Sequence, residues 1–374
     1  MNIICDKNKL LEGINIVLKA IPGKSTMAIL ECLVIEAENN TIKLIANDLE
    51  IGIETVIEGE IVEEGCVAIS AKVFSDIIRK LPSEQVEINV DEAYQLNIKC
   101  GKAKFNISAK PTDEFPYLPQ IVKDKYVEIS QFTLKDIIRQ TVFSISDNEN
   151  AKVMTGELFE INNSTLKVVS LDGHRISIRK VELKNNYDNI SVIIPGKTLI
   201  EINKILNGGI DDEVKIYFTE KHILFEFDNT IVLSRLIEGE YYKIDKMLSS
   251  DYETKITVNK KDMLDSIDRT TLLVKESEKK PVIIDIKDNS IGFAMNSSIG
   301  SMHEEMDAVR EGKDIIIGFN PRFLMDALRV IDDEEITLYM INPKAPCFIR
   351  DKDESYIYLI LIKMIGGCDG SNTD

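Results

Sequence analysis

The feature that most constrains this chain is an internal repeat, because a period that returns along a sequence fixes an architecture more firmly than local propensity does. One recurring segment joins a short strand, a polar break and an amphipathic helix, and its copies begin at residues 2, 127 and 256. The leucines that correspond in the three copies of this helix are Leu11, Leu134 and Leu264.

A second recurring segment, again a strand followed by a helix, begins at residues 67, 192 and 315. Both segments return in the same order, so we interpret the chain as three copies of one domain, each with two helices among many strands. The boundaries we expect are 1–123, 124–249 and 250–365, followed by a flexible tail over 366–374 that is rich in Gly and small polar residues.

The patterns between these segments predict an α+β fold. Each second helix is followed by alternating strands, and polar turns at 38–40, 162–164 and 288–290 suit hairpin loops. Two helices packed on antiparallel sheets leave open sheet edges, which pairing between successive domains would satisfy. A repeated head-to-tail contact of this kind produces either an open filament or a closed ring. Two chains with three domains each would form a closed ring. The helices are expected over 7–20, 72–81, 131–143, 197–206, 260–275 and 321–331.

Composition places the chain among ordinary globular proteins. Its 374 residues suit two or three domains, with 44% hydrophobic and 29% charged residues. The N-terminus lacks the pattern of a signal peptide and no stretch is long enough to cross a bilayer, so we expect a cytoplasmic location and no membrane partner. Six cysteines without C-x-x-C spacing indicate reduced thiols, and we expect no metal or other cofactor.

The net charge of −18 argues, on its own, against binding to nucleic acid. The six expected helices nevertheless carry sixteen Lys and Arg against eight Asp and Glu. Helices that lined the hole of a ring would attract DNA phosphates without regard to sequence, while an acidic outside would repel stray nucleic acid. The alternative is that solvated helix faces often carry basic residues. The candidate DNA-facing residues are Lys24, Lys72, Arg79, Lys80, Lys197, Arg322 and Arg329.

Short motifs along nearly the whole chain give a family resemblance. The most specific is S-L-D-G-H-R at 170–175, because it stands in a triplicated chain. The others are L-L-E-G-I-N from 10, K-S-T-M-A-I-L from 24, N-D-L-E at 47–50, K-P-T-D-E-F-P from 110, I-I-P-G-K at 193–197, L-I-E-G-E-Y-Y from 236 and G-F-N-P-R-F-L from 318. With these motifs the sequence resembles the β sliding clamp of bacterial DNA polymerase III.

The resemblance implies a fold and a function. The fold is three clamp domains with sheets outside and helices inside, which form a head-to-tail homodimeric ring. Such a ring encircles duplex DNA, slides along it and tethers the replicative polymerase by effective concentration, without catalysis of its own. The implied partners are a second copy of the chain, the DNA polymerase III alpha subunit, an ATP-driven clamp loader, and other polymerases and repair proteins. The chain itself lacks a G-x-x-x-x-G-K-[ST] phosphate loop.

The resemblance also assigns sites. Partners of the family dock short extended peptides in an apolar pocket between the second and third domains. The residues carried over to this pocket are Met154, Leu171, Gly173, His174, Arg175, Ile176, Met247, Asn320, Phe323, Leu359, Ile360 and Leu361. The ring-closing residues carried over are Phe105 on the first domain and Leu272 and Leu273 on the third.

The pocket can also be considered from its residues alone. Asp172-Gly173 suits a two-residue hairpin turn that would thrust His174 and Arg175 outward beside apolar strand positions, which is a rim and floor suited to a peptide. Without context, however, the dipeptide is simply a hairpin, and residues 359–361 would simply be a buried strand.

The sequence departs from the family near this pocket. Ile362, Lys363 and Met364 replace the usual finish of Pro, a hydrophobic residue and Arg. Tyr242 stands where some members have Pro, and residues 151–153 are Ala-Lys-Val instead of aromatic or basic residues. We therefore expect an altered preference for peptides, and the alternative to a working clamp is a diverged second copy that acts mainly as a peptide-binding scaffold.

An enzyme is the third class of function. It would use His174 with Asp172 as a base and its orienting carboxylate. The chain holds three histidines and no H-E-x-x-H, G-x-S-x-G or G-x-G-x-x-G motif, so catalysis is the weakest of the three interpretations.

Overall fold

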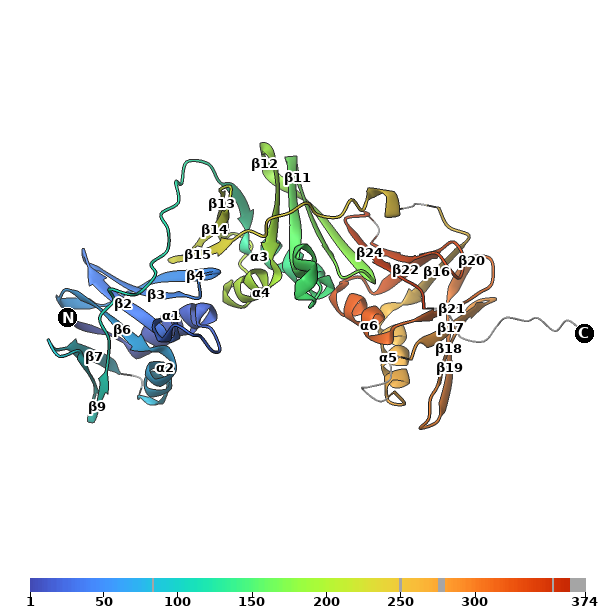
Figure 1. The fold of residues 1–374 in the computed structure, drawn as a ribbon. Helices are drawn as coiled ribbons and strands as arrows, with labels where there is room; N and C mark the ends of the chain where they lie inside the picture. Colours follow the sequence, from blue (N-terminus) through green and yellow to red (C-terminus); the bar gives the residue numbers. More distant parts are fainter. Residues whose placement is uncertain (83, 249–250, 275–279, 352, 364–374) are drawn as a thin grey trace, which may run out of the picture. The chain divides into compact units, whose positions relative to one another are not determined.

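The computed structural model of the chain describes residues 1–82, 84–248, 251–274, 280–351 and 353–363 (Figure 1). They group into two compact units, of which the first comprises Met1–Lys135 and Lys197–Leu236 and the second comprises Asp136–Gly196 and the described residues from Ile237 onward. The middle one of the three expected domains contributes to both units, so the expected boundaries stay predictions. The expected tail over 366–374 lies outside the described residues.

Two antiparallel sheets form the first unit. One has the order β5-β1-β7-β8-β9 and the other the order β10-β13-β14-β15-β4-β3-β2-β6. The first sheet comprises β1 (Asn2–Asp6), β5 (Glu60–Glu63), β7 (Gln85–Val90), β8 (Gln95–Cys100) and β9 (Ala103–Ser108). The second comprises β2 (Cys32–Glu38), β3 (Thr41–Asn47), β4 (Ile51–Ile57), β6 (Gly65–Ser70), β10 (Val127–Ser130), β13 (Glu213–Phe218), β14 (His222–Phe227) and β15 (Thr230–Arg235).

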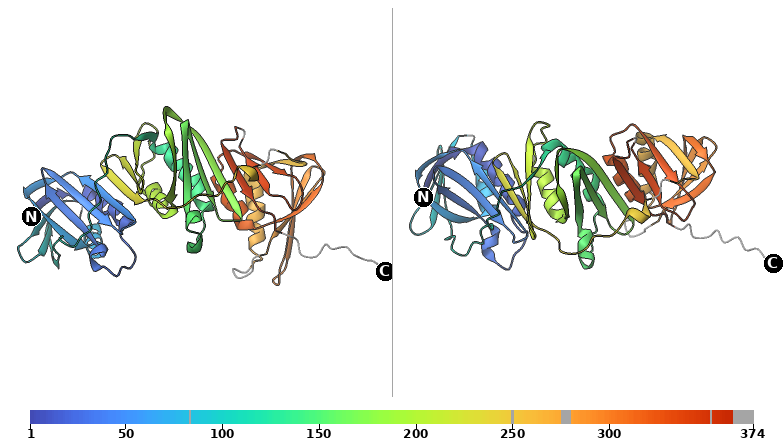
Figure 2. Two further views of the ribbon diagram at one scale, coloured as in Figure 1. Left: turned by 45° about the horizontal axis from the view of Figure 1, so that its top comes forward. Right: turned by 90° about the horizontal axis from the view of Figure 1, so that it is seen from above.

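Helix α1 (Lys7–Val17) begins where a polar side chain replaces missing backbone hydrogen bonds. The carboxylate of Asp6 accepts the backbone N–H groups of Asn8 and Lys9 at 2.8 and 3.1 Å. The apolar side of the helix, with Leu10 and Ile14 fully buried, then packs on the sheet of β3 and β4 (Figures 1 and 2). The helical segments are α1 (Lys7–Val17), η1 (Leu18–Ala20), η2 (Ala28–Glu31), α2 (Ala71–Lys80) and α4 (Gly196–Ile205), with α3 (Gln131–Thr141) beginning in this unit.

Two further antiparallel sheets form the second unit, in the orders β11-β12-β24-β23-β22-β16-β20 and β19-β18-β17-β21. The first comprises β11 (Gly156–Leu171), β12 (Arg175–Pro195), β16 (Thr254–Asn259), β20 (Val309–Gly312), β22 (Glu335–Met340), β23 (Cys347–Arg350) and β24 (Tyr356–Ile360). The second comprises β17 (Val282–Lys287), β18 (Ser290–Asn296), β19 (Ser301–Asp307) and β21 (Ile315–Phe319).

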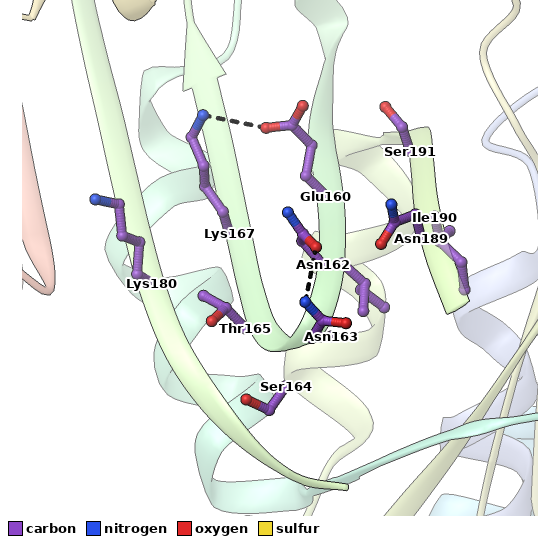
Figure 3. A pocket seen from close by; sticks show the side chains of 11 residues that line it. Glu160, Asn162, Asn163, Ser164, Thr165, Lys167, Lys180, Asn189, Ile190 and Ser191 are labelled. Carbon is purple, nitrogen blue, oxygen red and sulfur yellow. Dashed lines mark hydrogen bonds and ion pairs between the residues drawn. The ribbon is translucent and has the colours of Figure 1, made fainter. Parts of the chain in front are cut away.

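β11 is a hairpin in itself. It reverses at Asn163, whose φ of +54° suits a tight turn, and Lys167 on one arm pairs with Glu160 on the other at 3.1 Å (Figure 3). This is the turn expected at 162–164. The turns expected at 38–40 and 288–290 also contain residues with positive φ, namely Asn39, Asn40 and Asp288.

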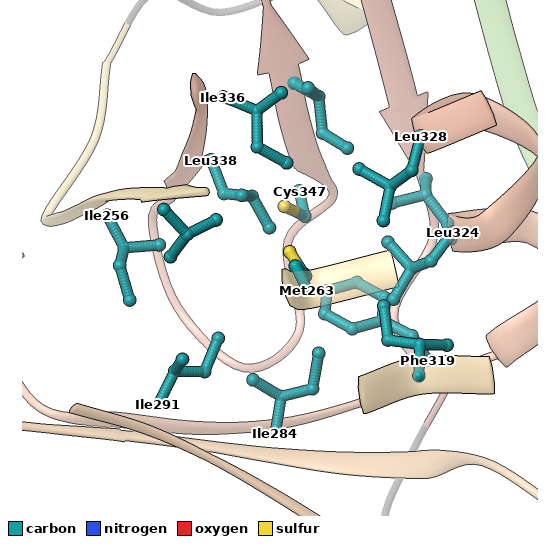
Figure 4. Close-up of a cluster of buried hydrophobic side chains, with 14 of the residues drawn as sticks. Ile256, Met263, Ile284, Ile291, Phe319, Leu324, Leu328, Ile336, Leu338 and Cys347 are labelled. Atoms are coloured by element: carbon teal, nitrogen blue, oxygen red, sulfur yellow. The ribbon is translucent and has the colours of Figure 1, made fainter. Parts of the chain in front are cut away.

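The core of the second unit lies between its helices and its sheets. Met263 on α5 (Lys260–Thr271) and Leu324 on α6 (Pro321–Val330) meet strand residues such as Ile284 and Phe319, all buried (Figure 4). Burial of such side chains is the main favourable contribution to folding. The remaining helical segments of this unit are η3 (Val142–Ser144), η4 (Glu149–Thr155) and η5 (Asp245–Met247).

The α+β class, the positions of the helices and the pairing of sheets from successive repeats agree with the sequence. β4 of the first repeat pairs with β15 of the second, and β12 of the second pairs with β24 of the third. Two details differ. α5 ends at Thr271, not at 275. The capping residues Asp6, Ser130 and Asn259 put Leu10 and Met263, not Leu11 and Leu264, in the place of the buried Leu134.

Candidate functional site

The most specific motif, Ser170 to Arg175, forms the tight turn between β11 and β12. Leu171 pairs with Ile176, and Gly173 at φ +85° occupies a conformation that glycine adopts without strain. The Asp172 carboxylate accepts the backbone N–H groups of His174 and Arg175 at 2.8 and 3.1 Å. The central residues of the turn are therefore Gly173 and His174, not the expected Asp172 and Gly173.

Arg175 points inward, which corrects the expectation that the turn thrusts it out. Its guanidinium donates to Asp172 at 2.9 Å, to Asp326 on α6 at 2.7 Å and to the Phe143 carbonyl at 2.6 Å. It also lies 4.3 Å from the centre of the Phe323 ring. Arg175 is 92% buried, and a buried charge must be paired. Its contacts connect the turn to η3 and to α6.

An apolar cluster lies beside Arg175. Leu171, Ile176 and Leu359 are nearly fully buried in it, and Met154 packs against it half-exposed. The linker after β15 supplies Tyr241, Ile244 and Leu248 to the same cluster. Four of the predicted pocket residues, from η4, β11, β12 and β24, are thus brought together.

Side chains at the border of this cluster remain accessible. Met247 is the last residue of η5 and is 50% exposed. Leu361 is 38% exposed and donates its N–H to the His174 carbonyl at 2.9 Å. The exposed His174 ring stacks on Phe323 at 6.1 Å between ring centres. Apolar side chains with a few polar groups at their border are typical of peptide-docking surfaces.

The remaining predicted pocket residues have other surroundings. Asn320 caps α6 by accepting the Arg322 N–H at 3.2 Å. Gly173 has open space around it. Ile360 is fully buried in the core between helices and sheets of the second unit and does not belong to the apolar cluster. The sequence analysis missed Asp326, Phe143 and Tyr241, because nothing in the local sequence indicates that they converge on Arg175 and Leu171.

Glu157 on β11 is a buried carboxyl group next to this site. Thr141 donates to its Oε2 at 3.0 Å, while its Oε1 has no hydrogen-bond partner. Complete burial raises the pKa of Glu157 well above its ordinary value, against the smaller lowering by the Thr141 hydrogen bond. The neutral carboxyl is therefore the form that suits the fold.

Replacement of Glu157 by Gln should raise stability at neutral pH by about 1 to 3 kcal/mol, because the amide is neutral at every pH, whereas the carboxyl must take up a proton or carry a buried charge when the chain folds. The pKa of Glu157 is higher in the folded chain than in the unfolded chain. The stabilising contribution of this carboxyl is therefore fully present below its pKa in the unfolded chain, and it is lost as the pH rises through its pKa in the folded chain. Thermal unfolding of both proteins between pH 4 and 8 checks this. We expect the curves to converge at pH 4, and a constant difference would contradict the titration.

The predicted DNA-facing residues are all exposed. Lys72, Arg79 and Lys80 lie on α2, and Arg322 and Arg329 on α6. Lys197 begins α4 and pairs with Asp48, so its charge is partly neutralised within the first unit. Lys24 lies in the loop after η1.

The predicted ring-closing residues lie in the first and third repeats. Phe105 is 40% exposed on β9, and Leu272 is 77% exposed just after α5. Leu273 is half-buried and packs against the core of the second unit. An apolar side chain as exposed as Leu272 is unusual for a structural residue and suits a contact that a single chain does not make.

A polar hollow that the sequence analysis did not indicate lies at the β11 hairpin. It encloses about 770 Å³ and is lined mainly by Asn, Ser, Thr and Lys side chains, including Asn162, Lys167 and Asn189 (Figure 3). Within the described part of the chain, no helix is long and apolar enough to cross a membrane.

Comparison with known proteins gives consistent matches over the three repeats. Residues 1–119, 128–243 and 245–364 match the family models of the N-terminal, central and C-terminal domains of the DNA polymerase III beta subunit, respectively. The beta sliding clamp of Bacillus subtilis strain 168 is 36% identical over 374 residues, which cover 96% of this chain and 99% of that protein.

Solved structures show the same likeness. The crystal structure of a DNA polymerase III beta subunit from Eubacterium rectale is 59% identical with a TM-score of 0.94, covering 97% of this chain and 99% of that one. The sliding clamp of Bacillus subtilis is 34% identical with a TM-score of 0.94, covering 98% and 99%.

Proposed function

The chain belongs to the family of DNA polymerase III beta subunits, the beta sliding clamps, and from that membership we propose that two copies form a ring around duplex DNA. The ring would be a mobile tether that keeps a replicative polymerase at its template. It would work in the cytoplasm, without a cofactor and without catalysis of its own.

Ring closure would use two of the strands that end sheets in the described part of the chain, β9 and β19. β9 ends one sheet of the first unit and β19 ends one sheet of the second, in the described part of the chain (Figure 1). An end strand exposes unpaired backbone groups, so a second copy can satisfy them. The exposed Phe105 lies on β9, and Leu272 follows the helix that packs on β18 and β19. These positions support a head-to-tail dimer.

The apolar cluster around Leu171 would dock partner peptides. Met247, Leu361 and His174 would contact the peptide directly, because their side chains are accessible. Arg175 would not contact the peptide itself. It would position His174, because it holds the turn between β11 and β12 against α6. The proposed partners are the DNA polymerase III alpha subunit, the clamp loader, and other polymerases and repair proteins.

Contact with DNA would come from the helices. Exposed basic side chains on α2 and α6 attract phosphates by a Coulomb term that does not depend on sequence. Lys197 would contribute less, because Asp48 competes for its ammonium group. Loose contact of this kind is what sliding requires.

The observation that carries the proposal is the match of all three domain models in family order along one chain. The test is primer extension by a DNA polymerase III with its clamp loader on a singly primed circular template. Addition of this protein should lengthen the products made in one binding event. Unchanged product length, with peptide binding intact, would favour the scaffold that no longer encircles DNA.

A further inference from the structure

The proposed docking site is assembled from two successive repeats. His174 and Leu171 belong to the second repeat, whereas Phe323 lies on α6 of the third. The rings of His174 and Phe323 stack with their centres 6.1 Å apart and their planes 27° apart. The form of the site therefore depends on where α6 lies against the second repeat.

The second repeat holds α6 at two places. The first is in the middle of the helix, where Arg175 pairs with Asp326 at 2.7 Å. The second is at its end, where Arg139 of α3 donates to the backbone carbonyl of Val330 at 2.9 Å and to the carboxylate of Asp332 at 2.7 Å. Val330 is the last residue of α6, so its carbonyl has no partner within the helix, and a cation there interacts favourably with the helix dipole.

Neighbouring side chains on α3 fix Arg139 in this place. The carboxylate of Asp136, about one turn earlier, accepts the Nε–H of Arg139 at 3.1 Å. The next residue, Gln140, is buried and donates to the same Val330 carbonyl at 3.4 Å. Charge-assisted hydrogen bonds such as those of Arg139 are stronger than bonds between neutral groups. We call the contacts of Arg139 with Val330 and Asp332 the α3–α6 bridge.

The contact between the first and second repeats carries different residues at these positions. There β4 pairs with β15, as β12 pairs with β24 between the second and third repeats. Counted from the first residue of each helix, Asn15 on α1 takes the place of Arg139, and Ile205 on α4 takes the place of Val330. Asparagine is shorter than arginine and uncharged. A hollow of about 700 Å³ lies at this place, and its lining includes Glu12, Asn15, Ile16, Ile205 and Asn207.

We propose that Arg139 is a positioning residue of the docking site, which holds Phe323 against His174 through the α3–α6 bridge. This inference rests on the proposed docking of partner peptides at the apolar cluster, and it adds a residue that acts on the site from the far end of α6. The bridge joins the two repeats that form the docking site. The hollow lies between the two repeats for which no docking is proposed.

Two anchors fix α6 better than one. Leu324 and Leu328 bury the helix in the core of its own repeat, but apolar packing is not directional. With Asp326 as the only polar anchor, α6 could pivot about that point, whereas an anchor at Val330, roughly 10 Å beyond Phe323 along the helix, prevents this. If the bridge is cut, some molecules hold Phe323 away from the turn, and the apparent affinity for a peptide falls with the fraction that remains competent.

Histidine ring signals test the positioning without any peptide. The chain has three histidines, His174, His222 and His303, so a protein labelled with ¹³C in its histidine rings gives three ring signals. In the full chain, Arg139→Ala should shift the His174 signal toward its position in Phe323→Ala, because the stacked ring no longer shields it. His222 and His303 lie on β14 and β19, so their signals should stay in place.

Peptide affinity tests the consequence of the positioning. Arg139→Ala should bind a labelled peptide from the DNA polymerase III alpha subunit about tenfold more weakly than the wild type, as expected for coupling between separate sites. Arg139→Lys should recover most of that loss, because an ammonium group can still donate to the Val330 carbonyl and to Asp332. Fluorescence anisotropy measures both variants.

Arg310→Ala is the matched control for a general loss of stability. Arg310 also donates to backbone carbonyls, those of Asp288 and Gly312, and it pairs with Asp314 at 3.0 Å. It belongs to the same unit but lies on β20, which ends the sheet of β16 and β22. We expect both alanine variants to lower the melting temperature, and only Arg139→Ala to lower peptide affinity.

The outcomes separate the positioning from the docking function. An unmoved His174 signal in Arg139→Ala would overturn the positioning, and so would equal losses of affinity in the Arg139 and Arg310 variants or no recovery with lysine. A wild-type chain that binds no peptide would overturn the docking function, while a shifted His174 signal would still show that Arg139 sets the place of α6. A shifted signal together with an affinity that lysine restores would support both.

Discussion

Replacement of Leu272 by alanine, alone and together with Leu273→Ala, should convert the dimer to monomers at concentrations where the wild-type protein is paired. A leucine buried in a well-packed contact contributes about 2 to 5 kcal/mol when truncated, and the ring contains each contact twice. Leu272 is 77% exposed in the single chain, so its loss should leave the melting temperature of the monomer unchanged. Leu273 packs on the core, and its loss should lower that temperature.

Sedimentation velocity across a dilution series measures this effect. The matched control is Ile210→Ala, because Ile210 is 69% exposed in the first unit and lies on neither β9 nor β19. We expect the control to remain dimeric. A Leu272→Ala protein with undiminished dimer affinity would show that the closing contact lies elsewhere.

Replacement of Met247 and His174 by alanine should abolish measurable binding of a peptide from the DNA polymerase III alpha subunit, a loss of a hundredfold or more. Both side chains are accessible at the border of the apolar cluster, and a few such residues dominate the affinity of a docking surface. Leu171→Ala should also weaken binding, but Leu171 is nearly fully buried, so we expect a loss of stability as well.

Fluorescence anisotropy of a labelled peptide measures this loss, and sedimentation confirms that the dimer is intact. Met27→Ala is the matched control, because Met27 is an exposed methionine of the first unit, at 43% against 50% for Met247. Peptide affinity within threefold of wild type in the double variant would place the docking surface outside the cluster.

The repeat made most of the fold predictable, because each copy carries the same strand, cap and helix pattern. α2 and α6 begin within one residue of their expected starts. The alignment of the first repeat with the second was off by one residue, since Leu10 and Leu11 are both apolar and only packing distinguishes the buried one.

The sequence predicted the site less well, because its contacts join residues far apart in the chain. Asp172-Gly173 indicated a turn, but only the fold brings Asp326 and the Phe143 carbonyl to the guanidinium of Arg175. Likewise, Leu359 and Ile360 are neighbours in sequence, yet strand alternation directs one to the apolar cluster and the other to the opposite core. Local pattern cannot assign such side chains to one face or the other.

Retention on DNA of different topology tests the central claim most directly. The protein would be loaded on nicked circular duplex DNA by its clamp loader, freed of unbound protein by gel filtration, and followed after the DNA is cut once by a restriction enzyme. A ring that holds DNA by enclosure stays on the circle for many minutes and leaves within seconds of linearisation. Equal rates of loss from circular and cut DNA would contradict a protein that encircles its template.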